Sequence, residues 1–207
     1  GVTTLTGEGT YWALDVVQGG TFTHNSGTVT VTTNTNTLIR GMEGDDTSGA
    51  GANALNNLIV NLGADSYRLE MDYLASDDSC VIAGDLTITR GKFYPRSTDD
   101  DGNSFTVTGD VLVSADGLYG VASRTGADSF GSLTIASGGE FIATSGTTTI
   151  NSRITATEYA WQNSGTFTHN NGTIKFAHPS AHSYVQESNF YDVEIALGSA
   201  GIESRWI

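Results

Sequence analysis

The chain has 207 residues with 23 acidic and 9 basic side chains, a formal charge of −14, and a single cysteine. This charge excludes the Lys- and Arg-rich surface that binds nucleic acid phosphates, and it disfavours binding to an anionic membrane surface. One cysteine excludes an internal disulfide framework, and no run of about 20 apolar residues predicts a membrane span.

Short apolar runs, most of them alternating with threonine, recur along the chain, and each run predicts a β-strand. In chain order they lie at 28–32, 86–89, 105–108, 111–113, 132–135, 147–150 and 173–176. Gly-, Asn- and Ser-rich turn signals separate them. The one helix-like stretch, 53–62, contains Leu58-Ile59-Val60, which fits a strand better. We therefore expect an all-β fold.

A ten-residue phrase occurs twice, as Gly-Thr-Phe-Thr-His-Asn-Ser-Gly-Thr-Val at 20–29 and as Gly-Thr-Phe-Thr-His-Asn-Asn-Gly-Thr-Ile at 165–174. A tryptophan precedes each copy, and an acidic-apolar strand follows each copy. The internal repeat therefore spans 11–62 and 159–197. The first copy is longer, and its extra residues are expected in the polar, Gly-rich stretch 40–54.

A shorter pattern, Gly-x-Leu-Thr-Ile followed by Gly-x-Phe, occurs at 84–93 and at 131–141, with a looser copy at 109–118. Its spacing of roughly 22–25 residues is typical of one turn of a β-solenoid, in which stacked turns align their apolar residues in inner ladders. We expect residues 1–207 to form one β-solenoid (parallel β-helix) with short turns, as a segment of a longer repetitive chain. A β-sandwich or jelly roll built from local hairpins is the alternative.

These phrases resemble those of β-helical repeat proteins of phage virions (tail fibres, tailspikes and capsid decoration proteins) and of bacterial surface adhesins. The resemblance covers 11–31, 85–150 and 159–195. It implies a non-catalytic structural protein of a virion or comparable extracellular assembly. Such a protein associates with copies of itself, as a trimer by analogy, and with other virion or surface proteins. The alternative is a glycan-binding adhesin segment at the bacterial cell surface, with calcium as a stabilising ion; a polysaccharide-degrading enzyme is less favoured.

The best candidate for a ligand site is the acidic segment 99–104. Asp99, Asp101 and Asn103 place oxygen atoms at every second position around a glycine, a pattern that suits calcium. The EF-hand pattern is incomplete because no Glu follows at the twelfth position, so a solvated acidic turn is the competing interpretation. The pairs at 45–46 and 77–78 are weaker candidates.

No other motif points to chemistry. The chain has no Gly-x-Ser-x-Gly nucleophile motif, P-loop or dinucleotide-binding fingerprint, so we expect no enzymatic activity and no cofactor other than calcium. His24 and His169 sit in the repeated turns and are expected to stabilise them rather than to bind metal. His178 and His182 are four residues apart, but Pro179 between them prevents the regular helix that would align them as metal ligands. Cys80 lies in an apolar run and is expected to be buried and inert. Burial is also expected for the aromatic residues around the repeat, in preference to a sugar-stacking surface: Tyr11, Trp12, Phe22, Tyr159, Trp161 and Phe167.

Overall fold

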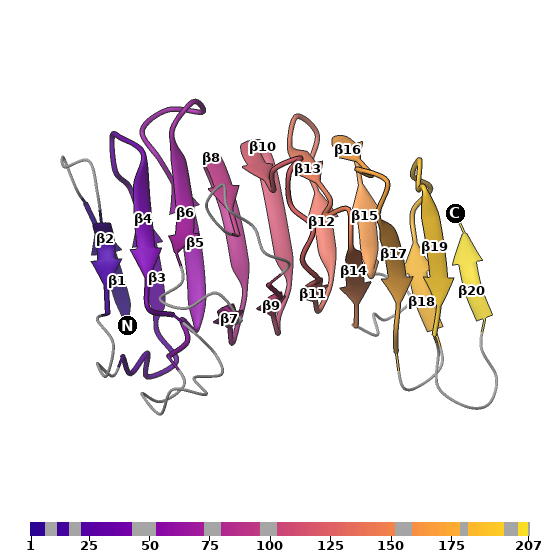
Figure 1. Ribbon diagram of the computed structural model, residues 1–207, viewed down its shortest axis with the longest axis horizontal. Coiled ribbons are helices and arrows are strands. Elements are labelled where there is room, and N and C mark those ends of the chain that lie inside the picture. Colours follow the sequence, from indigo (N-terminus) through magenta and orange to yellow (C-terminus); the bar gives the residue numbers. More distant parts are fainter. Residues whose placement is uncertain are drawn as a thin grey trace.

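The computed structural model describes residues 1–6, 12–16, 22–42, 53–72, 80–95, 103–151, 159–178, 182–196 and 203–206. Within them the regular elements are β-strands, and they stack as a parallel β-solenoid of about five turns (Figure 1). The all-β prediction and the solenoid are confirmed. The alternative is wrong, because hairpins need antiparallel pairs and the strands pair in parallel across turns. No described helix is long and apolar enough to cross a membrane.

The solenoid has three faces, through which the chain passes in the same order in each complete turn. Face 1 contains β1 (Val2–Leu5), β3 (Thr28–Val31), β5 (Asn57–Asn61), the first half of β8 (Leu86–Tyr94), the first half of β10 (Val111–Tyr119), β12 (Leu133–Ile135), β15 (Trp161–Asn163), β18 (His182–Val185) and β20 (Glu203–Trp206). Face 2 contains β2 (Trp12–Asp15), β4 (Thr37–Arg40), β6 (Arg68–Asp72), the second halves of β8 and β10, β13 (Glu140–Ile142) and β16 (Thr166–Thr168). Face 3 contains β7 (Cys80–Ile82), β9 (Phe105–Val107), β11 (Asp128–Phe130), β14 (Thr147–Ile150), β17 (Thr173–Phe176) and β19 (Asp192–Ile195).

The alternation of apolar and polar residues fills the interior with continuous rows of apolar side chains. Because the strands are parallel and in register, each inward side chain stacks on the inward side chain one turn away. On face 1, for example, Leu58 lies opposite Leu86, and Leu86 opposite Val111. All three side chains are buried. Removing this apolar surface from water is the main gain from stacking the turns.

An aromatic row runs along the inside of face 2. Phe93, Tyr119, Phe141 and Phe167 are in register, one from each of four successive turns. Their ring centroids are separated by 5.9, 4.7 and 6.2 Å in that order. Phe190 continues the row, 5.7 Å from Phe167. The aromatic residue of the Gly-x-Phe pattern is thus the core residue of face 2, within the centroid spacing that favours aromatic pairs.

The corner before face 1 explains the Gly-x-Leu-Thr-Ile pattern. Asn57 Oδ1 accepts a hydrogen bond from the amide of Asp85 at 2.9 Å, and Asp85 Oδ1 accepts one from the amide of Asp110 at 2.9 Å. In the next turn, the Ser132 hydroxyl donates to Asp110 Oδ1 at 2.7 Å. A side chain at Gly109 would collide with the Asp85 carboxylate. Glycine therefore makes room for the capping side chain of the turn before.

The repeated His-Asn turns form as predicted, with histidine as a turn-stabilising residue. Asn170 and Asn171 have φ values of 50° and 58°, in the left-handed region that asparagine tolerates better than most residues. His169 Nδ1 accepts a hydrogen bond from the Asn171 amide at 2.9 Å, and His24 Nδ1 accepts one from the Ser26 amide at 3.0 Å. The two copies nevertheless lead into different sheets, because the first enters β3 on face 1 and the second enters β17 on face 3.

Truncation of the aromatic row should destabilise the whole solenoid. Phe141 is fully buried between Tyr119 and Phe167, so Phe141→Ala should lower the free energy of unfolding by about 3–5 kcal/mol. The control is Thr106→Ala on the outside of β9, which should change it by less than about 0.5 kcal/mol. Urea unfolding followed by circular dichroism measures both; equal effects would contradict a core role for the row.

Candidate functional site

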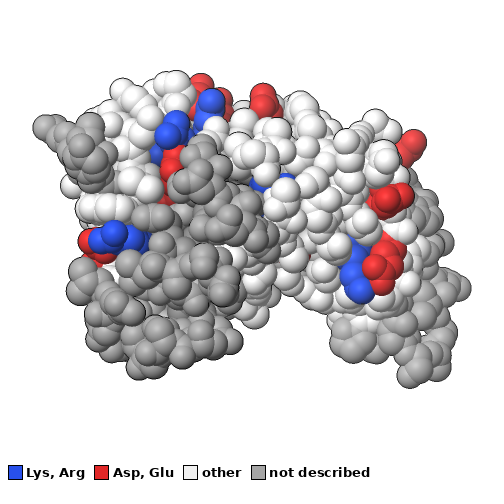
Figure 2. Space-filling view, viewed as in Figure 1, with Lys and Arg blue, Asp and Glu red and all other residues white. Residues whose placement is uncertain are grey.

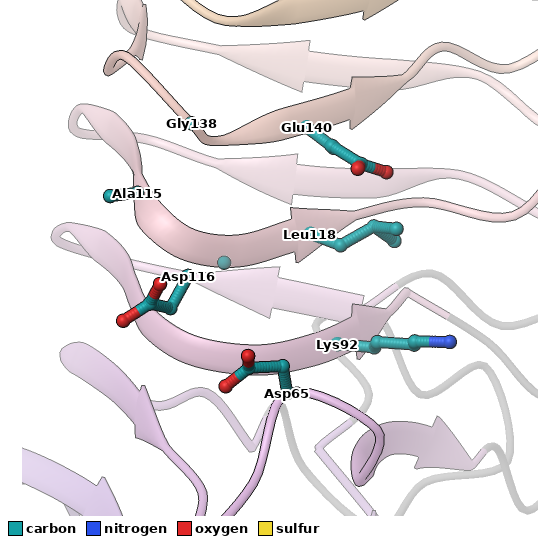
Figure 3. Close-up of a pocket in the computed structure, with 8 residues that line it drawn as sticks. Asp65, Lys92, Ala115, Asp116, Leu118, Gly138 and Glu140 are labelled. Atoms are coloured by element: carbon teal, nitrogen blue, oxygen red, sulfur yellow. The ribbon is translucent and has the colours of Figure 1, made fainter.

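A groove of about 390 Å³ lies on the outside of face 2, where β8, β10 and the segment before β13 bend (Figure 3). Asp65 and Asp116 lie at the bend, and the side chains of Lys92, Leu118 and Glu140 point in a common direction from neighbouring strands (Figure 3). The remaining lining residues are small: Ala115, Gly117 and Gly138. The groove is thus a shallow surface with charged walls and a floor that is largely main chain.

The fold places the charged residues of the groove through strand alternation. Lys92, Leu118 and Glu140 each immediately precede an inward aromatic residue, so their side chains point outward. They are in register, and each occupies the x position of the Gly-x-Phe pattern. The structure requires glycine at two positions of the floor. A side chain at Gly117 would collide with the Ile88 carbonyl, and Gly138 has a φ of 89°.

Charges in the groove are partly paired. Arg90 Nε lies 2.6 Å from Asp65 Oδ1. The hydrogen bond that Arg90 donates to Asp65, together with the negative charges of Asp65 and Asp116, raises the pKa of Arg90. Lys92 makes no ion pair with a described residue, and Glu140 is exposed. The groove therefore presents an ammonium group and carboxylates that are accessible to a ligand.

The side chains of the groove can form hydrogen bonds to a ligand. Carboxylates accept hydrogen bonds from hydroxyl groups, and the Lys92 ammonium donates them. The described residues contain no group of three His, Cys, Asp or Glu side chains able to hold a metal ion. The groove therefore offers hydrogen-bond donors and acceptors to a polar ligand.

A second surface feature lies on face 2 near the N-terminal end. The Arg40 guanidinium donates from Nε to Asp15 Oδ1 at 2.9 Å and from Nη2 to Oδ2 at 2.7 Å. Arg40 Cζ lies 4.2 Å from the centroid of the Trp12 ring, a cation–π distance. The hydrogen bond from Arg40 lowers the pKa of Asp15. Trp12, 42% exposed, is held in place by the charges beside it.

A charged pair is buried inside the solenoid at the corner between faces 2 and 3. Arg124 Nη2 and Asp128 Oδ1 are 2.7 Å apart, and both side chains are at most 1% exposed. The Tyr119 hydroxyl donates to Asp128 Oδ2 at 2.9 Å, and Arg124 also donates to the Asn103 carbonyl at 3.1 Å. Thr144 caps the same segment through the Arg124 carbonyl at 3.2 Å. These contacts join three successive turns through polar groups.

The predicted calcium ligands are only partly within the described residues. Asp99 and Asp101 lie outside them, as do the acidic pairs at 45–46 and 77–78. Asn103 is described; it is buried, and its carbonyl binds Arg124. The calcium site therefore stays a prediction.

The other sequence predictions have mixed outcomes. Cys80 is buried, and Trp161 is buried with Phe22 and Phe167 packed against the core, as expected. The burial predicted for Trp12 is wrong: Trp12 is in register with Leu38, an outward residue of β4, so its ring lies on the outside beside Arg40. Tyr11 lies outside the described residues, and Tyr159 is half-buried. The groove was missed, although the outward x positions of Gly-x-Phe could have indicated Lys92 and Glu140.

Comparison with known proteins gives no match to a family model, a curated protein or a solved structure.

Removal of either side chain of the buried Arg124–Asp128 ion pair should lower the stability of the fold. Asp128→Ala leaves the Arg124 charge buried without its carboxylate, so we expect the free energy of unfolding to fall by about 3–5 kcal/mol. Asp65→Ala breaks the exposed pair with Arg90 and is the matched control, with an expected loss of at most about 1 kcal/mol. Similar losses in the two variants, measured by urea unfolding, would show that burial of the pair is not what matters.

Proposed function

We propose that this chain is a non-catalytic structural segment of a phage virion or a comparable extracellular assembly, such as a fibre, spike or capsid decoration. The observation that carries the proposal is the uninterrupted core, in which inner rows on all three faces pass from turn to turn. Parallel hydrogen bonding on every face resists bending, and the aromatic row adds contacts along the same axis. A stiff rod of this kind suits a mechanical role.

Self-association and contact with other virion or surface proteins belong to this proposal. The resemblance to phage proteins implies a trimer. Calcium bound by Asp99, Asp101 and Asn103 would be a stabilising ion and not a catalytic one, because carboxylate and amide oxygens are its usual ligands.

A glycan-binding adhesin segment is the second candidate function, and the groove on face 2 favours it. Lys92 and Glu140 offer a donor and an acceptor on the two strands that flank β10, above a floor of small residues. This candidate ranks second because the aromatic row, which would make a sugar-stacking platform if it were exposed, lies inside the solenoid.

Location separates the two candidates. Antibodies against residues 1–207, visualised by immunogold electron microscopy, should label purified virus particles from a culture that produces the chain. Label on the bacterial outer surface instead would favour the adhesin, and label confined to the cell interior would contradict both. Pre-incubation of the antibodies with the purified chain is the control for specificity.

Binding to a glycan array tests the groove directly. If the chain is an adhesin, Lys92→Ala should weaken binding to the retained glycan by at least tenfold, since it removes the ammonium donor from the groove. Lys175→Ala is the matched control, because Lys175 lies on face 3 and pairs with Glu194 at 2.7 Å. Absence of any glycan binding, or equal effects of the two variants, would contradict the adhesin function.

A further inference from the structure

We propose that the outer surface of face 2 around Trp12 is a second carbohydrate site, which stacks one ring of a neutral oligosaccharide on the exposed indole. The inference deepens the glycan-binding candidate described above and rests on it for the class of ligand. It uses residues outside the groove, so the two sites can be tested separately.

A β-bulge in β2 builds this surface. In a regular strand, two residues that are three positions apart point to opposite faces of the sheet. Relative to β4, however, β2 has one extra residue between Trp12 and Leu14. Trp12 and Asp15 therefore both lie beside outward residues of β4, which are Leu38 and Arg40. The bulge thus places an aromatic ring and a carboxylate on the same outer surface, and re-aiming a side chain in this way is a known use of bulges.

The indole is held in one orientation and is still accessible. Arg40 Cζ lies 4.2 Å from the centroid of the Trp12 ring, so the guanidinium covers one face of the ring. Trp12 is nevertheless 42% exposed, and the exposed part is therefore the opposite face and the edge. Asp15 fixes Arg40 with two hydrogen bonds, at 2.9 and 2.7 Å, which lowers the cost of ordering the site when a ligand binds. A sugar ring can pack its C–H face on such an indole while its hydroxyl groups reach the polar rim.

A pocket of about 290 Å³ continues the surface along face 2. Leu38 is in register with Trp12, and Glu70 is in register with Leu38. Leu38 and Glu70 line the pocket together with Arg68 and the corner segment 35–37. Neighbouring strands are about 4.8 Å apart, so Trp12 and Glu70 lie about 10 Å apart along the solenoid. This length can hold two linked sugar rings, the first on Trp12 and the second over Leu38.

The charges of this surface are paired, which favours a neutral ligand. Asp15 pairs with Arg40, and Glu70 pairs with Arg68. In the view of Figure 2 most of the described basic side chains lie beside acidic ones. A charged ligand would lose hydration and gain little from such balanced pairs. Each Asp15 oxygen accepts one hydrogen bond from Arg40 and can accept a second one, which a sugar hydroxyl can donate.

An array of neutral, uronic-acid and amino-sugar oligosaccharides, followed by calorimetric titration of each retained one, tests the site. The chain should retain neutral oligosaccharides, and Trp12→Ala should weaken their binding about tenfold or more because it removes the stacking surface. Tyr191→Ala is the matched control and should leave the affinity unchanged. Tyr191 is also an exposed aromatic residue, but it lies directly before β19 at the other end of the solenoid (Figure 1). Circular dichroism checks that both variants are folded.

A comparison with the groove separates the two sites. Retention of charged oligosaccharides alone, or equal effects of Trp12→Ala and Tyr191→Ala, would overturn the site at Trp12. If Lys92→Ala abolishes binding and Trp12→Ala does not, the ligand occupies the groove, so the Trp12 site fails and the adhesin function stands. Absence of binding to any oligosaccharide would overturn both the site and the adhesin function and leave the structural role standing.

Discussion

The parallel, in-register pairing of each turn with the next is the constraint on which the rest of this structure depends. It places every side chain next to its counterpart one turn away, at about 4.8 Å. Each residue of an inner row must therefore be compatible with its counterparts in the neighbouring turns, because a buried charge repeated along a row would lie next to a like charge. Leu58, Leu86 and Val111 meet this condition on face 1, as Phe93, Tyr119 and Phe141 do on face 2.

Asp128 is the informative exception. It occupies an inward position of face 3 between Phe105 and Thr148, where the neighbouring turns carry no charge. The cost of burying its carboxylate is offset by Arg124 from the corner segment just before β11 and by the Tyr119 hydroxyl from face 2. Phe105 and Thr148 occupy the same inward position in the two neighbouring turns, so the ion pair marks one turn as different from its neighbours. It thereby favours a single register in a fold whose apolar rows would tolerate several.

The local alternation of apolar and polar residues predicted the strands, but it could not predict which residues of different turns contact each other. The alternation in Leu86-Thr87-Ile88 is enough to predict which residues point inward and which point outward, and Gly109 predicts a corner as a turn residue. The number of residues between one turn and the next determines three features that the alternation does not show. They are the bends within β8 and β10, the pairing of Arg124 with Asp128, and the exposed position of Trp12. The repeated His-Asn phrase shows the limit plainly: its two copies form the same local turn but enter different sheets.

Because of the same constraint, the residues that can vary with function lie on the outside of the solenoid. Inward residues are dictated by stacking, but the x position before each aromatic residue is free, and it carries Lys92, Leu118 and Glu140 in successive turns. On face 1 the outward residues Thr30, Thr87 and Thr134 are in register with Ile59 and Leu112. Threonine favours a strand and stays hydrated, so these positions satisfy the fold without determining what the surface binds. Binding properties can therefore change from turn to turn on the outside of the solenoid while the inner rows stay the same.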